Sequence, residues 1–379
     1  MDCLATSRDT PMNATTELDR LGQRLWLDNI TRDLLVSGTL KRYVRDFAVS
    51  GLTSNPTIFD HAIRNTNLYD EAIRDGAAHG RSGEALFLDL AVADVTGAAD
   101  LFRPIHDTTA GIDGWASLEV SPLLADDGAG TVRETIRLYT RAQRPNLFIK
   151  IPGTRAGVTA IEESIFAGVP VNVTLLFSRE QYLAAAEAYM RGVERRIAAD
   201  LDPKVASVAS IFVSRWDVAV KNTVPVALHN RLGIAMAKRA YKAYRELLAS
   251  ARWGKLAAAG ARPQRLLWAS TGTKDPAASD TLYVQALAAP DTINTLPDKT
   301  LLAFADHGRL CGEMPTDGGD AETTLAEFAQ AGVDEPVLAE QLLREGTQSF
   351  DTSWAHLMQC IASKARVLGK SAPVHESVR

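Results

Sequence analysis

A lysine among apolar neighbours is the residue of this sequence with the clearest chemical potential. Lys150 lies in the segment FIKIP, between Ile149 and Ile151. Burial in such surroundings favours the neutral amine, which can attack a carbonyl carbon and form a Schiff base. An isolated lysine in an apolar run is more often structural, with its ammonium group paired or extended to solvent. Two acidic residues at the ends of similar runs, Asp28 and Glu119, favour the catalytic interpretation.

Further polar residues follow or close short apolar runs along the chain. Because residues i and i+2 of a strand share a face, Asn172 should point the same way as Thr174, and Ser210 the same way as Phe212. If the runs are strands of one sheet, these side chains meet in one polar centre. The full set is Asp28, Asn55, Glu119, Lys150, Asn172, Thr174, Ser210, Arg215 and Ser270.

Eight short runs rich in β-branched and aromatic residues have the length of strands, and most are separated by segments with helical periodicity. The runs are residues 24–28, 50–55, 115–121, 146–152, 170–176, 208–214, 265–270 and, more weakly, 291–296. Alternation of strand and helix requires a parallel sheet, and about eight repeats is the number at which such a sheet closes. The sequence therefore predicts the α/β class and a single (β/α)8 TIM barrel, whose chemistry belongs at the strand ends.

Two regions of the sequence are longer than a minimal (β/α)8 barrel requires. The gap at residues 56–114 has room for several helices, including an apolar pattern over residues 83–101. After about residue 320, helical patterns recur, the longest over residues 336–368. We expect these to be additional helices packed on the barrel, which would occupy residues 21–379 after an N-terminal leader segment at residues 1–20.

Composition narrows the class of protein. The 379 residues carry 41 Lys and Arg against 46 Asp and Glu, a net charge of −5. No concentrated basic face is evident, so we expect no nucleic-acid partner. The sequence shows no secretory signal and no apolar run long enough to span a membrane. The cysteines Cys3, Cys311 and Cys360 have no disulfide or zinc-site spacing, which fits a cytoplasmic location.

Several segments, taken in their order along the chain, resemble the transaldolase family. The length of the chain is similar to that of the family's longer bacterial class. The segments are GLTSNPTIF at 51–59, SLEVSPLLADD at 117–127, LFIKIPGTRAGVTAIE at 147–162, VNVTLLFSREQY at 171–182, SIFVSRWD at 210–217 and WASTGTKDP at 268–276. The resemblance implies a barrel with a Schiff-base lysine on its fourth strand, where Lys150 falls. It also implies an enzyme of the non-oxidative pentose phosphate pathway.

The implied reaction moves a dihydroxyacetone unit between sugar phosphates. The donor is sedoheptulose 7-phosphate, the acceptor is glyceraldehyde 3-phosphate, and the products are erythrose 4-phosphate and fructose 6-phosphate. Lys150 would form the imine, and Asp28 would exchange the proton of the C4 hydroxyl. Without the resemblance, Asp28 is equally well explained as the N-cap of the next helix. Glu119 and Thr174 match the pair that handles a catalytic water.

The remaining positions match groups that hold the substrate. Asn55, Asn172 and Ser210 resemble the contacts to the three-carbon unit, although Asn55 before Pro56 also suits a turn or a helix start. Arg215 matches a guanidinium that binds the phosphate, and its alternative is an ordinary surface arginine.

Shorter transaldolases carry an arginine two residues after the serine that matches Ser270, whereas Gly272 stands here. The segment STGTK could replace that arginine with backbone N–H groups and Lys274, or could be a plain surface loop. Phe212, if it faces the adduct, would keep water from the enamine; otherwise it fills the barrel.

Other chemistries have less support. The histidines lack metal-binding spacing, and no nucleotide fingerprint is present, so we expect no metal and no cofactor. Two alternatives stay open: an aldolase similar to fructose-6-phosphate aldolase that releases free dihydroxyacetone, and a non-catalytic barrel that binds sugar phosphates. The sequence fits a monomer or a homodimer, and the chain could belong to a longer fusion.

Overall fold

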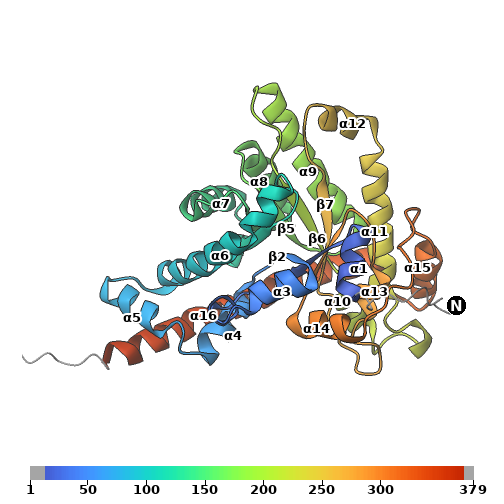
Figure 1. The fold of residues 1–379 in the computed structure, drawn as a ribbon. Helices are drawn as coiled ribbons and strands as arrows, with labels where there is room; N and C mark the ends of the chain where they lie inside the picture. The colour runs from blue at the N-terminus through green and yellow to red at the C-terminus, as the bar shows by residue number, and fades with distance from the viewer. Residues whose placement is uncertain (1–12, 371–379) are drawn as a thin grey trace, which may run out of the picture.

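Eight parallel strands form a closed barrel in the computed structural model, which describes residues 13–370 (Figure 1). Neighbours in the sequence are neighbours in the sheet, and β8 closes onto β1. All eight predicted strands are therefore confirmed, as is the TIM-barrel fold. The strands are β1 (Arg24–Leu27), β2 (Val49–Leu52), β3 (Trp115–Glu119), β4 (Leu147–Pro152), β5 (Val171–Leu176), β6 (Ser207–Phe212), β7 (Gln264–Ala269) and β8 (Ile293–Leu296).

Helices connect successive strands on the outside of the barrel. Those from β1 to β2 are α2 (Arg32–Val36) and α3 (Thr39–Phe47). Those from β3 onward are η1 (Pro122–Leu124), α7 (Gly128–Ala142), α8 (Arg155–Phe166), α9 (Arg179–Ala198), α10 (Ser214–Val220), η2 (Val226–Leu228), α11 (Leu232–Leu248), α12 (Ala251–Ala258), α13 (Leu282–Ala286) and α14 (Asp298–His307). Their starts are locally encoded; for example, Ser178 and Gln181 form a capping box at α9.

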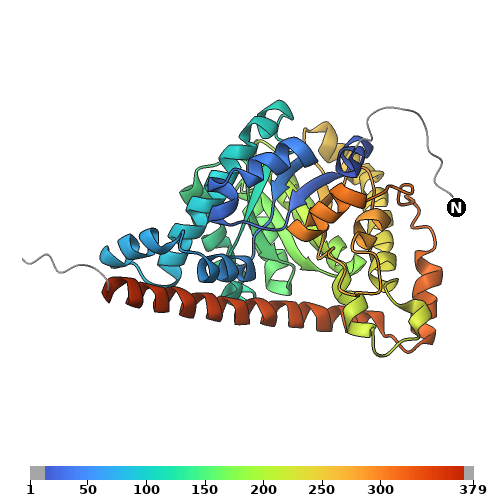
Figure 2. The ribbon, with the colours of Figure 1, turned by 60° about the horizontal axis from the view of Figure 1, so that its bottom comes forward.

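The additional helices lie where the sequence predicts them. The gap after β2 holds α4 (Pro56–Asn65), α5 (Asp70–Ala78) and α6 (Gly83–Thr108), and the tail holds α15 (Ala321–Gln330) and α16 (Glu335–Lys370). Figure 2 shows α16 as a long red helix along one side of the molecule. It contacts α4, α5 and α6, and also η1 and β5. Because α4 and η1 follow the carboxyl ends of β2 and β3, α16 lies at that end of the barrel.

The predicted leader overlaps a packed helix. Residues 1–12, with Cys3 among them, lie outside the described residues. α1 (Ala14–Leu21) begins at the capping residue Asn13 and packs against α14 and β1, with Leu18 completely buried. The packed part of the chain therefore includes residues assigned to the leader from the sequence.

Aromatic side chains fill the amino-terminal part of the barrel. Trp115 and Phe148 stack with their ring centroids 4.1 Å apart, and Trp26 lies 6.0 Å from Phe148. Phe148 precedes Lys150 by two residues on β4, so both side chains point inward. The aromatic rings therefore form a floor beneath the lysine.

Candidate active site

A cavity of about 250 Å³ opens at the carboxyl ends of the strands. Its wall comes from the ends of several strands, from the loops that follow them, and from α16. Nine of the eleven residues singled out from the sequence line it: Asp28, Asn55, Lys150, Thr174, Ser210, Phe212, Arg215, Ser270 and Lys274. Glu119 and Asn172 are buried beside it.

Strand register places Lys150 between two of its expected partners. Lys150 is opposite Glu119 on β3 and opposite Asn172 on β5. Its Nζ donates to the backbone oxygen of Ser54 at 2.9 Å and to Oε2 of Glu119 at 3.2 Å. The Lys150 and Glu119 side chains are only 6% and 7% exposed. The lysine is thus fixed at the bottom of the cavity and is not extended to solvent.

Asp28 follows β1 and is held by Thr53, which is itself bonded to Thr295; neither threonine was among the residues predicted from the sequence. Thr53 donates its hydroxyl hydrogen to Oδ1 of Asp28 at 2.8 Å, and its oxygen lies 2.8 Å from that of Thr295. Since Thr53 has one hydroxyl hydrogen, Thr295 must donate to Thr53. The N-cap of α2 is Thr31, whose side chain accepts from the Leu34 N–H group. The alternative interpretation of Asp28 as that helix's cap is therefore wrong.

Burial acts on both carboxyl groups near the lysine. It raises the pKa of Asp28, against the opposing effects of the Lys150 charge and the Thr53 hydrogen bond. It also raises the pKa of Glu119, partly offset by the charge and hydrogen bond of Lys150. The positive charge of Lys150 thus favours the ionised form of both acids, and the charge of Asp28 acts in the opposite direction on Glu119.

A break in strand pairing marks the position of Thr174. The register between β5 and β6 shifts between Val173 and Leu176, and Leu175 has a left-handed backbone with φ of 59°. Such a conformation is strained for a residue other than glycine. The Thr174 hydroxyl lines the cavity and has no hydrogen-bond partner among the described residues. It is therefore available to a molecule in the cavity.

The amides differ in how firmly they are held. Ser210 donates to Oδ1 of Asn172 at 2.7 Å, and Nδ2 of Asn172 donates to Oγ of Ser117 at 3.2 Å. Asn55 caps α4, because its Oδ1 accepts from the Ile58 N–H group at 3.0 Å. Asn55 therefore has the helix-capping role that its position before Pro56 suggests. Its amide nitrogen makes no hydrogen bond within residues 13–370, so the residue can also serve the cavity.

Two cations face the cavity without an ion pair among the described residues. Arg215 lies near the start of α10, beyond the end of β6, with its guanidinium carbon 5.4 Å from the ring centroid of Phe212. Burial lowers the pKa of Arg215, and the charge of Glu345 opposes this. A methyl group built on Gly272 would lie 3.7 Å from Nζ of Lys274. The Lys274 ammonium group thus lies close to where the Cβ atom of an arginine at position 272 would be.

The chain is similar to known proteins over most of its length. The family model described as "Transaldolase/Fructose-6-phosphate aldolase" matches residues 25–361. The chain belongs to this family. It is 46% identical to the transaldolase of Frankia alni over 369 residues, which cover 95% of this chain and 98% of that protein. The transaldolase of Thiobacillus denitrificans is 44% identical over 355 residues, covering 92% and 99%.

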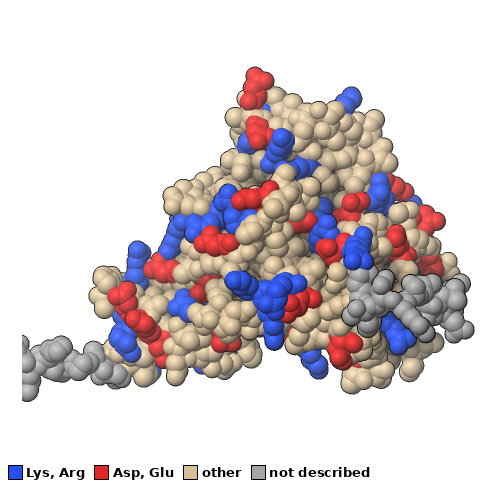
Figure 3. Space-filling view, in the orientation of Figure 1, with Lys and Arg blue, Asp and Glu red and all other residues tan. Residues whose placement is uncertain are grey.

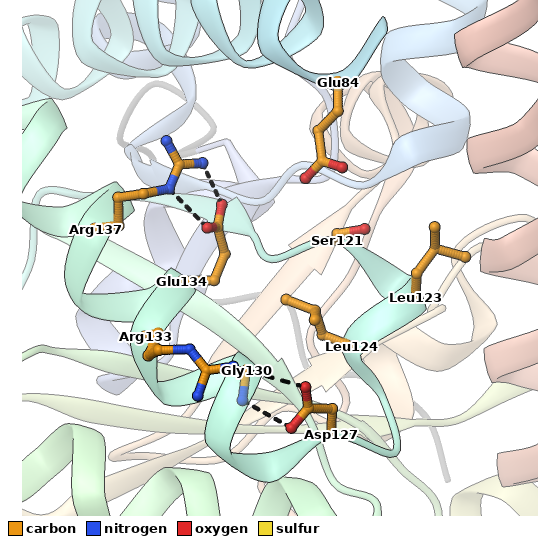
Figure 4. Close-up of a pocket in the computed structure, with 9 residues that line it drawn as sticks. All are labelled: Glu84, Ser121, Leu123, Leu124, Asp127, Gly130, Arg133, Glu134 and Arg137. Atoms are coloured by element: carbon orange, nitrogen blue, oxygen red, sulfur yellow. Dashed lines mark hydrogen bonds and ion pairs between the residues drawn. The ribbon is translucent and has the colours of Figure 1, made fainter.

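A second cavity, of about 320 Å³, lies away from Lys150, beside η1 and α7 (Figure 4). Its charged side chains are largely occupied with local contacts. Arg137 forms a bidentate pair with Glu134, and Asp127 caps α7 by accepting from the Gly130 N–H group. This cavity is larger than the barrel cavity, but no lysine among the described residues lines it, so the barrel cavity is the stronger candidate for the active site.

Within residues 13–370, no group of three or more His, Cys, Asp or Glu side chains is arranged to hold a metal ion. No described helix has both the length and the apolar character of a membrane span. On the face shown in Figure 3, basic and acidic side chains are interspersed.

Proposed function

We propose that this protein is a transaldolase that transfers a dihydroxyacetone unit through a Schiff base on Lys150. The observation that carries the proposal is the buried lysine at the bottom of the barrel cavity, 3.2 Å from a Glu119 oxygen and beneath two unpaired cations. Full-length similarity to proteins named transaldolase supports it. The substrates would be the sugar phosphates of the non-oxidative pentose phosphate pathway, in the cytoplasm.

The first half of the reaction forms the imine. The neutral Lys150 amine attacks the C2 carbonyl of the ketose phosphate, and the carbonyl oxygen takes up a proton to give a carbinolamine. Loss of that hydroxyl as water leaves a protonated imine. Glu119 exchanges the protons of this dehydration, and the Thr174 hydroxyl, which has no protein partner, holds the water.

The second half breaks and remakes a carbon–carbon bond. Asp28 takes the proton of the C4 hydroxyl, the C3–C4 electron pair moves into the iminium, and the aldose phosphate leaves. The remaining enamine attacks the carbonyl carbon of the acceptor aldehyde, and Asp28 returns its proton to the new hydroxyl. Hydrolysis of the imine then frees Lys150. Each atom and electron pair is thereby accounted for without an additional co-reactant.

Asn55, Asn172 and Ser210 would hold the hydroxyl groups of the three-carbon unit. Arg215, Ser270 and Lys274 would hold the phosphate, with Lys274 in place of the second arginine of the shorter family members. The absence of an ion pair at Arg215 and Lys274 within the described residues supports this, because the phosphate would supply the missing negative charge.

Reductive trapping tests the proposal directly. With fructose 6-phosphate present, borohydride should convert the imine into a stable secondary amine, and peptide mapping should find the adduct on Lys150. Lys150→Met should remain folded, lose turnover and no longer be labelled. Labelling of a different lysine, or turnover by the variant, would refute the assignment.

A further inference from the structure

The long helix α16 supplies part of the active-site wall. It contacts β5, η1 and α4 at the carboxyl end of the barrel, and two of its residues, Ser349 and Phe350, line the cavity. The phenyl ring of Phe350 is buried, at 6% exposure, whereas Ser349 is exposed. A wall on this side therefore comes from a segment outside the eight strand-to-helix loops.

One face of α16 meets the barrel. Gly346, Ser349, Phe350 and Ser353 follow the spacing i, i+3, i+4, i+7, which places them on one side of a helix. Ser353 anchors this face, since its hydroxyl lies 2.7 Å from that of Thr57 on the rim of the cavity. The position of Ser349 over the cavity is thus set by contacts on both sides of it.

Gly346 brings the helix backbone next to the phosphate-binding candidate Arg215. A methyl group built on Gly346 would lie 3.4 Å from Nη1 of Arg215 and 3.0 Å from a Leu175 methyl carbon. The preceding residue, Glu345, contributes a negative charge that acts on Arg215. Ser349 lies about one turn further along the same face. Its hydroxyl makes no hydrogen bond within residues 13–370 and is free to donate to an anion.

From this arrangement we infer that α16 is the outer wall of the phosphate site. Ser349 is a further ligand for the phosphate monoester, and Gly346 is the positioning residue that leaves room for the Arg215 guanidinium. The inference rests on the proposed function, because it names the group of the substrate that this side of the cavity receives. A hydroxyl and a guanidinium are both suited to phosphate oxygens.

Ser349→Ala tests the ligand role. We expect KM for fructose 6-phosphate to rise roughly three- to tenfold with kcat nearly unchanged, as for loss of one hydrogen bond made equally in ground and transition states. Competitive inhibition by inorganic phosphate should weaken by a similar factor. Ser349→Thr, which keeps the hydroxyl, should restore both. Thr352→Ala is the control, because that exposed hydroxyl bonds to the α16 backbone at Gln348.

Gly346→Ala tests the positioning role. The added methyl group would lie 3.0 Å from the Leu175 side chain, so it should shift the helix relative to Arg215 and weaken phosphate inhibition, while borohydride trapping at saturating substrate still labels Lys150. Gly369→Ala is the matched control, since a methyl group there, also on α16, would meet nothing within 4 Å. Equal effects of the two substitutions would contradict a specific role for Gly346.

The outcomes separate this inference from the proposed function. A wild-type protein without transfer activity or imine trapping would refute the proposed function. Calorimetry of phosphate binding to wild type and Ser349→Ala would still test whether Ser349 is a phosphate ligand. An active wild type with unchanged KM and phosphate inhibition in Ser349→Ala would overturn the inference alone. A raised KM with unchanged phosphate inhibition would also overturn it, because Ser349 would then contact another part of the sugar.

Discussion

Lys150 shares its end of the barrel with two acids whose pKa values are raised by burial, Asp28 and Glu119. A carboxyl group with a raised pKa takes up and returns protons more readily near neutral pH than an exposed one. The two acids have different neighbours. Glu119 contacts the lysine, while Asp28 accepts a hydrogen bond from Thr53, whose hydroxyl in turn contacts that of Thr295. This separation suits imine chemistry for the first and carbon–carbon cleavage for the second.

Asp28→Ala should lower kcat by roughly 10²- to 10⁴-fold and change KM much less, because its proton transfer occurs as the bond breaks. In the wild-type protein, kcat should fall on the acidic side of its pH profile, because the base must be ionised. The midpoint of this fall should lie above the ordinary pKa of an aspartate, because burial raises the pKa of Asp28. The control is Thr31→Ala, which removes the true cap of α2 and should cost about 1 kcal/mol of stability without loss of kcat. The reverse pattern would return Asp28 to a structural role.

Phe212 bears on the choice between transfer and release. Its ring lines the cavity and cannot orient water or carry a proton. Phe212→Tyr would place a hydroxyl beside the adduct and should raise the release of free dihydroxyacetone from fructose 6-phosphate relative to transfer onto erythrose 4-phosphate. Both products can be measured in coupled assays. If a folded, active variant keeps the wild-type ratio, Phe212 is only packing.

The strands and helices of the barrel position these residues through strand register, helix caps and one bulge in β5. Parity along β6 gives the joint orientation of Ser210 and Phe212, and the β5 bulge at Leu175 sets Thr174. After β6, α10 turns toward α11 and carries Asp217, which is 5% exposed. Asp217 accepts from the Leu232 and Gly233 N–H groups at 2.9 and 3.2 Å. It thereby ties the segment that carries Arg215 to the start of α11.

Asp217 makes the stability of this junction dependent on pH. Burial raises its pKa to about 6, above the ordinary value of 3.8, despite hydrogen bonds from Tyr283 and two backbone N–H groups. The folded state therefore binds this proton more tightly, so its contribution to stability is present below about pH 4 and is lost as pH rises to about 6. The difference amounts to roughly 3 kcal/mol.

Urea unfolding of wild type and Asp217→Asn at several pH values measures this contribution. The free energy of unfolding of wild type relative to the variant should fall between pH 4 and pH 7, because the amide does not titrate in that range. A difference that stays constant, or that rises with pH, would show that Asp217 is an ordinary ionised cap in the folded protein.

At the scale of the whole molecule, the proposed phosphate site lies in a chain of net charge −5. Attraction of a sugar phosphate therefore depends on the cations that line the cavity, Arg215 and Lys274, and not on the overall charge. In the proposed mechanism, the iminium on Lys150 is the electron sink and takes the role that a metal ion has in metal-dependent aldolases. We expect dialysis against EDTA to leave transaldolase activity unchanged; loss of activity that a divalent ion restores would refute the Schiff-base mechanism.

The barrel was predictable because each strand is a short β-branched or aromatic run, and alternation with helices leaves few ways to close the sheet. Most candidate site residues followed from one rule, that chemistry lies at strand ends. Thr53 also obeys that rule, two residues before Asn55, and could have been found by parity. Thr295 lies in the weakest strand signal.

Ser349 and Leu175 show the limit of local signals. Nothing in the helical pattern of residues 336–368 indicates that α16 crosses the cavity, because this depends on contacts with α4, η1 and β5 far away in the sequence. Leu175 adopts a left-handed backbone without the glycine that normally announces one. The packing of its side chain beneath Gly346 is a tertiary contact that no short window contains.

The place of α16 in the chain affects the order in which the site is completed during synthesis. A ribosome translates Lys150 and all eight strands before it reaches Gly346 and Ser349. A nascent barrel that folds as it emerges would therefore hold a reactive amine while its phosphate side is still open to solvent. A chain cut by a protease before α16 would be in the same condition, and its lysine would be accessible to aldehydes that carry no phosphate.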